Sequence, residues 1–183
     1  MQSMLNIATQ AATQAAKMIS QHVDRLDIVR VSKKSHNDFV TEVDRKSEKI
    51  IIEHIEKYYP DHQIIAEESG PQVKTSDYTW IIDPLDGTNN FIHGYPQISI
   101  SIALQYKSEI VMGLVYDPLS HDIFSAISGK GAKLNNTRIR IKEPKNLSRS
   151  LIGTGFPFRD KQSIENYLKI FREVLEHCSD IRR

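Results

Sequence analysis

Four acidic residues stand where they could act together as ligands or catalysts. Glu67 and Glu68 follow the apolar run "QIIA", while Asp83 ends the apolar run "YTWIID" and Asp86 comes three residues later. If the two runs are neighbouring strands, their carboxyl ends bring these carboxylates into one small region. Two carboxylates about 5 Å apart repel each other by roughly 3 kcal/mol at an effective dielectric near 20. Such a cluster therefore needs protons, basic partners or a metal ion.

A divalent cation is the simplest way to balance these charges. Between Glu67 and Phe91 the only basic residue is Lys74, which lies in a polar stretch, and the same segment contains no His or Cys. Oxygen ligands favour Mg²⁺, with Mn²⁺ or Ca²⁺ next, over zinc. Two carboxylates that share ions suit two-metal phosphoryl chemistry.

The residues that follow the acids have the properties of a phosphate-binding segment. Gly87 allows a tight backbone turn, and the free amides of Gly87 and Thr88 at the start of a helix can bind an anion. The Thr88 hydroxyl could orient a water molecule. The spacing thus predicts that metal and phosphate meet at one site.

Each signal also has an ordinary structural interpretation. "PLDG" is a good type I turn, and adjacent glutamates such as Glu67 and Glu68 are typical of a solvated loop. Asp44, three residues after Thr41, has the spacing of a capping-box partner. It is the combination of strand-end Glu pair, strand-end Asp, a second Asp and Gly-Thr that favours the metal and phosphate interpretation.

Three helices are predicted around these residues. The first runs from Met4 to about Val23 with one face of small residues, which suits close helix packing. The second begins near Thr41, and its shared face contains Val43, Ser47, Ile51, Ile55 and Tyr58. The third spans about Ser163 to Cys178, with an apolar stripe of Ile164, Tyr167, Leu168, Phe171, Val174, Leu175 and Cys178.

The middle of the chain has the period of strands. Ile98, Ile100, Ile102 and Leu104 alternate strictly, so they mark the clearest strand. "QIIA", "YTWIID", "EIVMGLVYD" and "DIFSAI" are further strands, "GKGAKLNNTRIRI" predicts a hairpin, and "RVSKKSHND" a loop or loose hairpin. Helices followed by a run of strands favour an α+β or layered sandwich with a largely antiparallel sheet.

Composition narrows the class of protein. The chain has 183 residues and a net charge of +1, which argues against bulk nucleic acid or an anionic membrane as partner. Its single cysteine, Cys178, excludes an internal disulfide framework and a cysteine-cluster zinc site. The first twenty residues resemble neither a signal peptide nor a membrane span, and we expect a cytoplasmic protein.

Other possible signals favour ordinary roles. "GKG" lacks the spacing of a phosphate loop and predicts a hairpin turn, and His93 is expected in a surface or loop role. Arg138, Arg140 and Lys142 alternate in the manner of a solvated strand face.

Three motifs resemble, in order and spacing, the N-terminal motifs of the inositol monophosphatase family: "NDFVTEVDRKSE", "AEESG" and "WIIDPLDGTNNF". "MLNIA", "YDPLSHDIFSAISGKGAKLNN" and "GTGFPF" extend the resemblance over essentially the whole chain. It is strongest to the bacterial inositol-1-monophosphatase branch, whose members can also act in transcription antitermination. The implied fold is the layered αβαβα sandwich of the inositol monophosphatase and fructose-1,6-bisphosphatase superfamily. Residues 1–183 would form its N-terminal α+β portion, with long helices packed on a largely antiparallel sheet.

The resemblance implies a Mg²⁺-dependent, lithium-sensitive phosphomonoesterase, with two or three ions in the complete enzyme. Its substrate would be myo-inositol 1-phosphate or a similar small polyol or sugar phosphate, attacked by a metal-activated water. Glu67 and Asp83 resemble ligands of the first ion, together with the Leu85 carbonyl. Asp83 and Asp86 resemble ligands of the second.

Catalytic and phosphate-binding residues are implied in the same way. Thr88, supported by Asp44, and Glu67 resemble the group that activates the attacking water. Asp86, Gly87 and Thr88 would hold the phosphate and substrate.

Two features differ from the family or stay open. Lys33 or Lys34 matches a family lysine near the active site, and the spacing does not distinguish them. Asn89 stands where many relatives have Thr.

The family's second motif, a Trp-Asp followed by small residues, belongs to a C-terminal subdomain whose Asp completes the second metal site. This sequence has Trp80 alone and ends at "HCSDIRR". We therefore expect residues 1–183 to lack the C-terminal subdomain.

The same motifs leave other functions open. Related phosphatases act on fructose 1,6-bisphosphate, 3′-phosphoadenosine 5′-phosphate or histidinol phosphate. A function of another class is transcription antitermination by binding elongation factors or RNA polymerase. The family also implies a homodimer.

Overall fold

The computed structural model describes residues 1–23, 31–35, 38–141, 146–157 and 161–183; of residues 31–35, 38–40 and 161 it describes only the backbone. The side chains of Lys33, Lys34 and Lys142, for which we made predictions, lie outside the described residues. The chain forms two compact units, 1–140 and 141–183. In the parts of the chain described, no helix combines the length and apolar character needed to cross a membrane.

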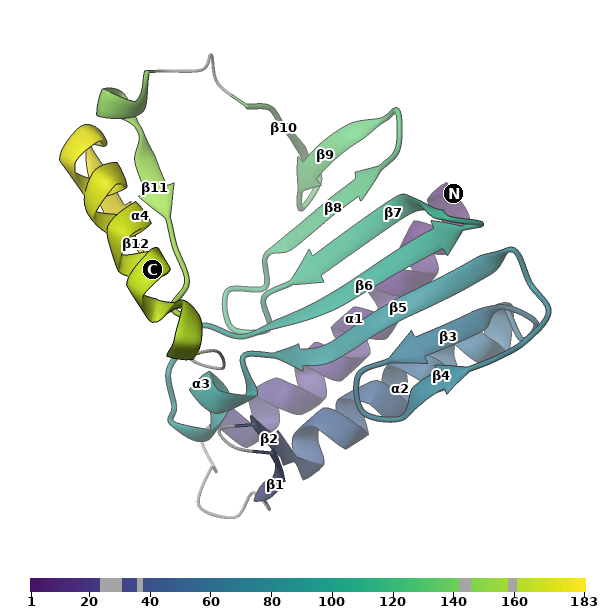
Figure 1. Ribbon diagram of the computed structural model, residues 1–183. Helices are drawn as coiled ribbons and strands as arrows, with labels where there is room; N and C mark the ends of the chain where they lie inside the picture. The colour runs from purple at the N-terminus through teal and green to yellow at the C-terminus, as the bar shows by residue number, and fades with distance from the viewer. Residues whose placement is uncertain (24–30, 36–37, 142–145, 158–160) are drawn as a thin grey trace. The chain divides into compact units, whose positions relative to one another are not determined.

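The first unit consists of two long helices, a hairpin and a large sheet (Figure 1). Its helices are α1 (Gln2–Val23), α2 (Glu42–Tyr58) and the short α3 (Thr88–Ile92). Its strands are β1 (Val31–Ser35), β2 (Asp38–Thr41), β3 (Gln63–Ala66), β4 (Gly70–Gln72), β5 (Tyr78–Asp86), β6 (Ser99–Tyr106), β7 (Glu109–Tyr116), β8 (Ile123–Ile127), β9 (Gly131–Leu134) and β10 (Thr137–Ile139).

The described strands form an eight-stranded sheet in the order β10-β9-β8-β7-β6-β5-β3-β4, and β1 and β2 pair separately as an antiparallel hairpin. All neighbours in the large sheet are antiparallel except β3 and β5, which are parallel. The predicted α+β class with a largely antiparallel sheet is confirmed, as are the loose hairpin around residues 31–41 and the hairpin of β9 and β10.

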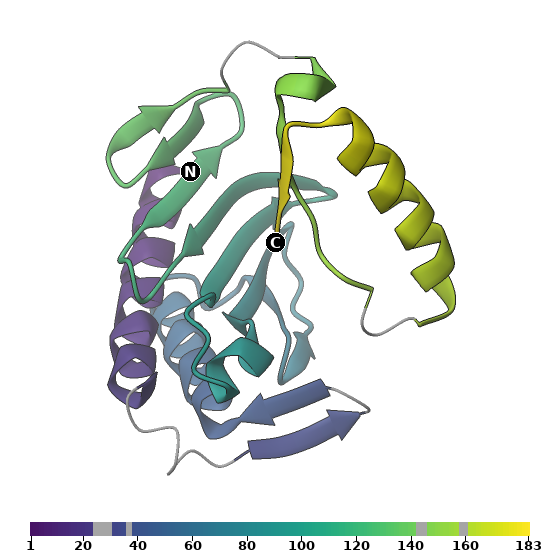
Figure 2. The same ribbon diagram turned by 90° about the vertical axis from the view of Figure 1, so that its left-hand side faces the viewer.

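Helices α1 and α2 lie side by side against one face of the sheet (Figure 2). The small-residue face predicted for α1 is fully buried and consists of Ala8, Ala11, Ala12, Ala15 and Ala16. Because alanine has no long side chain, the two helices can approach closely. From the sheet side, the alternating Ile98, Ile100, Ile102 and Leu104 complete this core, as predicted.

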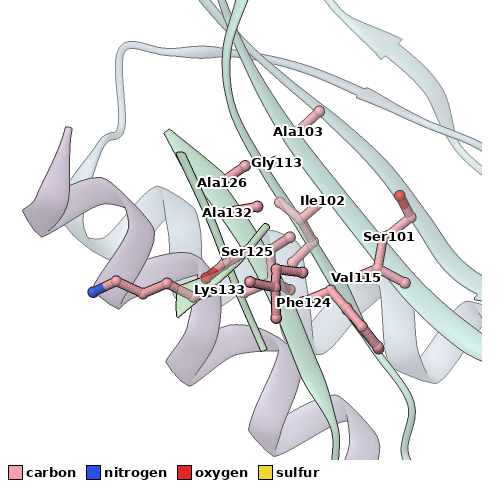
Figure 3. Close-up of a pocket in the computed structure, with 12 residues that line it drawn as sticks. Ser101, Ile102, Ala103, Gly113, Val115, Phe124, Ser125, Ala126, Ala132 and Lys133 are labelled. Carbon is pink, nitrogen blue, oxygen red and sulfur yellow. The ribbon is translucent and has the colours of Figure 1, made fainter. Parts of the chain in front are cut away.

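The opposite face of the sheet is lined by small and apolar side chains (Figure 3). A shallow hollow of about 240 Å³ lies over β6 to β10. Short side chains form its floor: Ser101, Ala103, Gly113, Ala126 and Ala132. Val115 and Phe124 beside them are 41% and 43% exposed within the described residues.

The second unit contains β11 (Leu151–Gly153), α4 (Ile164–His177) and β12 (Asp180–Arg182), with one-turn 3-10 helices at Leu147–Arg149 and Lys161–Ser163. Strands β11 and β12 pair in parallel. The Tyr167 ring contacts Phe156 edge to face and Phe171 at a tilt, and the Tyr167 hydroxyl lies 3.1 Å from the Thr154 hydroxyl.

Two details of the predicted elements were wrong. Tyr58 was placed on the buried face of the second helix, but it is 47% exposed because it ends the helix beyond the sheet contact. Strand β5 does not stop at Asp83 but continues to Asp86. The helix α4 is present as predicted, yet no residue of its apolar stripe is buried in the described structure.

Candidate functional site

The parallel pairing of β3 and β5 gathers the predicted carboxylates. Ala66 is in register with Ile82, so the next residues, Glu67 just after β3 and Asp83 within β5, lie side by side. The Glu67 amide donates to the Ile82 carbonyl at 3.1 Å, which ties the two strand ends together. The condition on which the sequence prediction depended, that these strands are neighbours, is met.

The crowding of these acids changes the protonation of Asp83. Burial, repulsion by Glu67, a hydrogen bond shared with the Glu67 side chain and repulsion by Asp86 together raise the pKa of Asp83 to about 7. The Leu85 amide, which donates to Asp83 Oδ1 at 3.2 Å, acts in the opposite direction. Burial is the largest cause, and the acidic neighbours add to it, so Asp83 titrates near neutral pH.

Lys74 does not supply that charge. Its ammonium donates to Glu56 Oε1 at 2.7 Å and to the Pro60 carbonyl at 2.8 Å. Both partners belong to the region where α2 ends, not to the ends of β3 and β5. Lys74 is the only base between Glu67 and Phe91, and its ammonium binds groups other than the acids of the site.

A bulge in β5 shapes the segment that links the two aspartates. Asp83 pairs with Ser101 and Asp86 with Ser99, so β5 has one more residue than β6 over this stretch. Such a bulge re-aims side chains and carbonyls locally. The "PLDG" segment is therefore a bulged strand end rather than the simple type I turn considered from the sequence.

Thr88 and Asp44 meet although 44 residues separate them. The Thr88 hydroxyl donates to Asp44 Oδ1 at 2.7 Å and also lies 3.1 Å from the Leu85 carbonyl. A hydroxyl has one proton, and the shorter contact to a carboxylate is the stronger one. Because the Thr88 hydroxyl donates its hydrogen bond to Asp44, the Thr88 oxygen can accept a hydrogen bond from a water molecule.

Asp44 is at the same time a helix cap. Its Oδ2 accepts from the Thr41 amide at 2.9 Å and from the Thr41 hydroxyl at 2.5 Å, and the Thr41 hydroxyl in turn accepts from the Val43 and Asp44 amides. The capping box and the contact with Thr88 use different oxygens of one buried carboxylate. The two interpretations of Asp44 that the sequence left open are thus compatible.

Two residues of α2 that the sequence analysis did not assign to the site also hold it. The Ser47 hydroxyl donates to the Pro84 carbonyl at 2.7 Å, and Glu48 Oε2 accepts from the Glu68 amide at 2.8 Å. Both side chains are buried, at 0% and 5% exposure. Polar residues three and four positions after Asp44, on the buried face of an amphipathic helix, were the signal that could have identified them.

Gly87 is held against a neighbouring loop. Its φ is +89°, and a Cβ at this position would lie 2.7 Å from the Gln97 carbonyl oxygen. That carbonyl is fixed by the Asn90 side-chain amide, which donates to it at 2.7 Å. Because α3, which follows Gly87, has only five residues, its dipole is small and any anion here would depend on individual amides.

The chemistry of the donor set favours one class of cation. Within the described ranges, no three His, Cys, Asp or Glu side chains are grouped closely enough to hold a metal ion as they stand. What gathers is the hydrogen-bonded Glu67 and Asp83 pair, with Asp86 near enough to raise the Asp83 pKa. This set of anionic oxygens without sulfur or imidazole fits Mg²⁺ in its chemistry and does not fit zinc. His93, by contrast, is exposed and contacts its own helix through the Asn89 carbonyl, in line with the expected loop role.

Replacing Gly87 with alanine should destabilise the protein for two reasons. Alanine disfavours the positive φ of this residue, and its Cβ would clash with the Gln97 carbonyl oxygen. Gly70 has a similar φ of +77°, but a Cβ added there would meet nothing within 4 Å, so Gly70→Ala isolates the backbone cost. We expect Gly70→Ala to lower the unfolding free energy by about 1–2 kcal/mol and Gly87→Ala by at least about 1 kcal/mol more. Urea unfolding of both variants would test this, and equal losses would show that the Gln97 contact is not limiting.

The protonation of Asp83 predicts a pH-dependent stability in a solution with EDTA. The folded state holds a proton between about pH 4 and pH 7 that the unfolded chain has released, so stability falls as pH rises through this window. The full shift corresponds to about 4 kcal/mol, which solvent screening at this part-exposed site reduces to about 1 kcal/mol. Asp83→Asn should therefore melt about 2–4 °C above the wild type at pH 8 and show no such advantage at pH 4.

Asp77→Asn, which changes an exposed carboxyl just before β5, is the control for loss of one surface charge. A melting-temperature difference for Asp83→Asn that stays constant from pH 4 to pH 8 would contradict the prediction.

Comparisons with known proteins agree with this architecture. The sequence profile of the inositol monophosphatase family matches residues 1–183. A protein named Nus factor SuhB from Pseudomonas aeruginosa is 46% identical over 188 residues, which cover 100% of this chain and 69% of that protein.

Two solved structures show the same fold. The extragenic suppressor protein suhB from Bartonella henselae has a TM-score of 0.94 at 36% identity. The match covers 99% of this chain and 70% of that protein. The inositol monophosphatase from Anabaena has a TM-score of 0.85 at 33% identity, with 100% of this chain covering 66% of it. Profile, sequence and structure thus agree over the whole chain, which belongs to the inositol monophosphatase family.

Proposed function

We propose that this chain provides the metal- and phosphate-binding portion of a Mg²⁺-dependent phosphomonoesterase that acts on myo-inositol 1-phosphate or a similar small polyol phosphate. The hydrogen bond from Thr88 to the buried Asp44, next to the acidic pair of Glu67 and Asp83, carries the proposal. A cap or a turn alone does not require a hydroxyl, two adjacent acids and a glycine with positive φ at one place. Family membership supports the reaction class.

Thr88 and Glu67 would prepare the attacking water. The Thr88 hydroxyl donates its hydrogen bond to Asp44, so the Thr88 oxygen would accept a hydrogen bond from the water and fix its direction. Glu67 is the nearby carboxylate that would take the water's proton. Because Asp44 is also tied into the α2 cap, the Thr88 hydroxyl is held on a rigid element rather than on a mobile loop.

The acids would bind Mg²⁺ through Glu67, Asp83, Asp86 and the Leu85 carbonyl. Bound magnesium would supply Lewis-acid stabilisation of the phosphoryl oxygens and a lower pKa for the water. Asp83 would release the proton it shares with Glu67 when a cation binds. The Gly87 and Thr88 amides would then hold the phosphate, with Asp86 beside it.

The proposal is tested by phosphate release from myo-inositol 1-phosphate with and without Mg²⁺. The 183-residue chain is compared with any longer natural form of it. In the active form we expect Thr88→Val, which removes the hydroxyl at constant shape, to lower kcat by about 10²–10⁴-fold. Thr88→Ser, which keeps the hydroxyl, should retain most of the activity, and circular dichroism checks that both variants fold.

Two results would contradict the proposal. One is that neither form releases phosphate from any sugar or polyol phosphate; the other is that Thr88→Val is as active as wild type. A panel with fructose 1,6-bisphosphate, 3′-phosphoadenosine 5′-phosphate and histidinol phosphate separates the related phosphatase activities. A large preference for one of these would replace inositol phosphate as the substrate.

A second candidate function is transcription antitermination, which the name Nus factor of the Pseudomonas aeruginosa relative favours. If this function is independent of catalysis, Asp83→Asn should capture transcription elongation factors or RNA polymerase as strongly as wild type in a pull-down. Loss of capture in this variant would instead couple the binding to the acidic site. No capture by the wild type would exclude this function for the chain.

A further inference from the structure

Ser47 is a polar residue in the middle of the apolar face of α2. It is 0% exposed, and Val43 and Ile51, four residues before and after it on the helix, are also 0% exposed. A buried hydroxyl costs free energy unless it is hydrogen-bonded, and alanine would be the better helix former at such a position. The group that the hydroxyl contacts therefore decides what a serine contributes here.

The Ser47 hydroxyl does not follow the local pattern of the other long helix. On α1 the hydroxyls of Thr9, Thr13 and Ser20 each donate to the carbonyl four residues earlier in the same helix. The Ser47 hydroxyl instead donates at 2.7 Å to the Pro84 carbonyl, 37 residues away in the sequence. It thus connects α2 to the segment of β5 that carries Asp83.

This contact holds one side of a peptide unit whose other side holds Asp83. The Pro84 carbonyl and the Leu85 amide belong to the same unit, which is trans and therefore directs the two groups to opposite sides. The Leu85 amide donates to Asp83 Oδ1 at 3.2 Å. Because the unit is planar and rigid, the Ser47 hydroxyl helps to set the direction from which the amide meets the Asp83 carboxylate.

The bulge makes support from outside the sheet necessary. Pro84 and Leu85 lie between Asp83 and Asp86, and neither has a β6 residue in register within the described strands. Proline also has no amide hydrogen to donate to a neighbouring strand. The ladder that fixes a regular strand is interrupted here, so the orientation of this peptide unit depends on side chains such as Ser47.

The next carbonyl along the chain is held from the same helix. The Leu85 carbonyl lies 3.1 Å from the Thr88 hydroxyl, which donates to Asp44 at 2.7 Å. Asp44 and Ser47 are three residues apart and therefore lie on one face of α2. Both carbonyls of the bulge are thus positioned relative to α2, one by Ser47 directly and the other through Thr88.

We propose that Ser47 is a positioning residue for the metal site. Its hydroxyl fixes the Pro84–Leu85 peptide unit and, through it, the Asp83 carboxylate and the Leu85 carbonyl. The inference rests on the function proposed above, where these two groups are assigned to Mg²⁺. Ser47 itself contacts neither metal nor substrate. Groups that orient metal ligands in this way typically change metal affinity 10- to 100-fold when they are removed.

The chain offers a matched control for the loss of this hydrogen bond. Ser47→Ala removes the hydroxyl and leaves a good helix former in its place. The hydroxyl of Ser20 on α1 contacts the Ala16 carbonyl at 2.9 Å and the Pro118 carbonyl at 3.0 Å, and neither belongs to the proposed metal site. Ser20→Ala therefore removes the same kind of contact, from a serine to a proline carbonyl, without touching the acids.

Two measurements separate support of the peptide unit from metal binding. The first is hydrogen exchange of the Leu85 amide by NMR in EDTA, where we expect Ser47→Ala to exchange about 10-fold faster than wild type. The second is calorimetric titration with Mg²⁺ at pH 8, where Ser47→Ala should raise the Kd about 10-fold. Ser20→Ala should stay within about 2-fold of wild type in both.

The proposal is overturned if Leu85 exchange is unchanged in Ser47→Ala, or if Ser20→Ala changes it equally. It is also overturned if exchange becomes faster while the Mg²⁺ Kd stays the same. If the wild type binds no Mg²⁺, the proposed function fails and the metal role of Ser47 fails with it. The exchange measurement in EDTA then shows separately whether Ser47 supports the peptide unit.

Discussion

The site depends on one electrostatic constraint: acidic side chains crowd together where β3 and β5 run parallel, with Asp83 beside Glu67 and near Asp86. Glu67 and Asp83 share a hydrogen bond, and Asp83 retains a proton near pH 7 because burial and its acidic neighbours disfavour its charge. Lys74, the one base in that segment, is engaged by Glu56 and a carbonyl. Under the proposed function, a divalent cation would replace this proton and offset the repulsion among the carboxylates. Stability and ligand binding would then be linked through the same few oxygens.

Helix α2 holds the segments around the acidic residues in fixed positions. Asp44, Ser47 and Glu48 occupy successive positions on its buried face, and each holds a different segment of the site: Thr88, the Pro84 carbonyl and the Glu68 amide. Ile51 and Ile55, farther along the same face, are fully buried against the sheet and anchor the helix. One amphipathic helix thus fixes the ends of β3 and β5 and the hydroxyl of Thr88 relative to each other. The N-terminal turn of α2 is polar because of the site, and the rest is apolar because of the core.

Local patterns in the sequence predicted much of this. The alternation from Ile98 to Leu104 identified a central strand, because side chains of a half-buried strand must alternate. The spacing of Thr41 and Asp44 identified the start of α2, since capping is decided within one turn. The bulge between Asp83 and Asp86 was missed because it depends on how β5 pairs with β6, and Pro and Gly suggest a turn in isolation. The roles of Ser47, Glu48 and Asn90 were missed for the same reason: their partners lie on other elements or loops, and periodicity does not report such contacts.

Because α3 is short, phosphate binding also depends on the charge of the neighbouring acidic residues. A five-residue helix has too weak a dipole to attract an anion on its own, and Gly87 offers backbone amides rather than charge. A phosphate would arrive next to three carboxylates, where it is repelled unless a cation is already present. Each ligand then lowers the cost of binding the other, and by linkage the coupling must be equal in both directions.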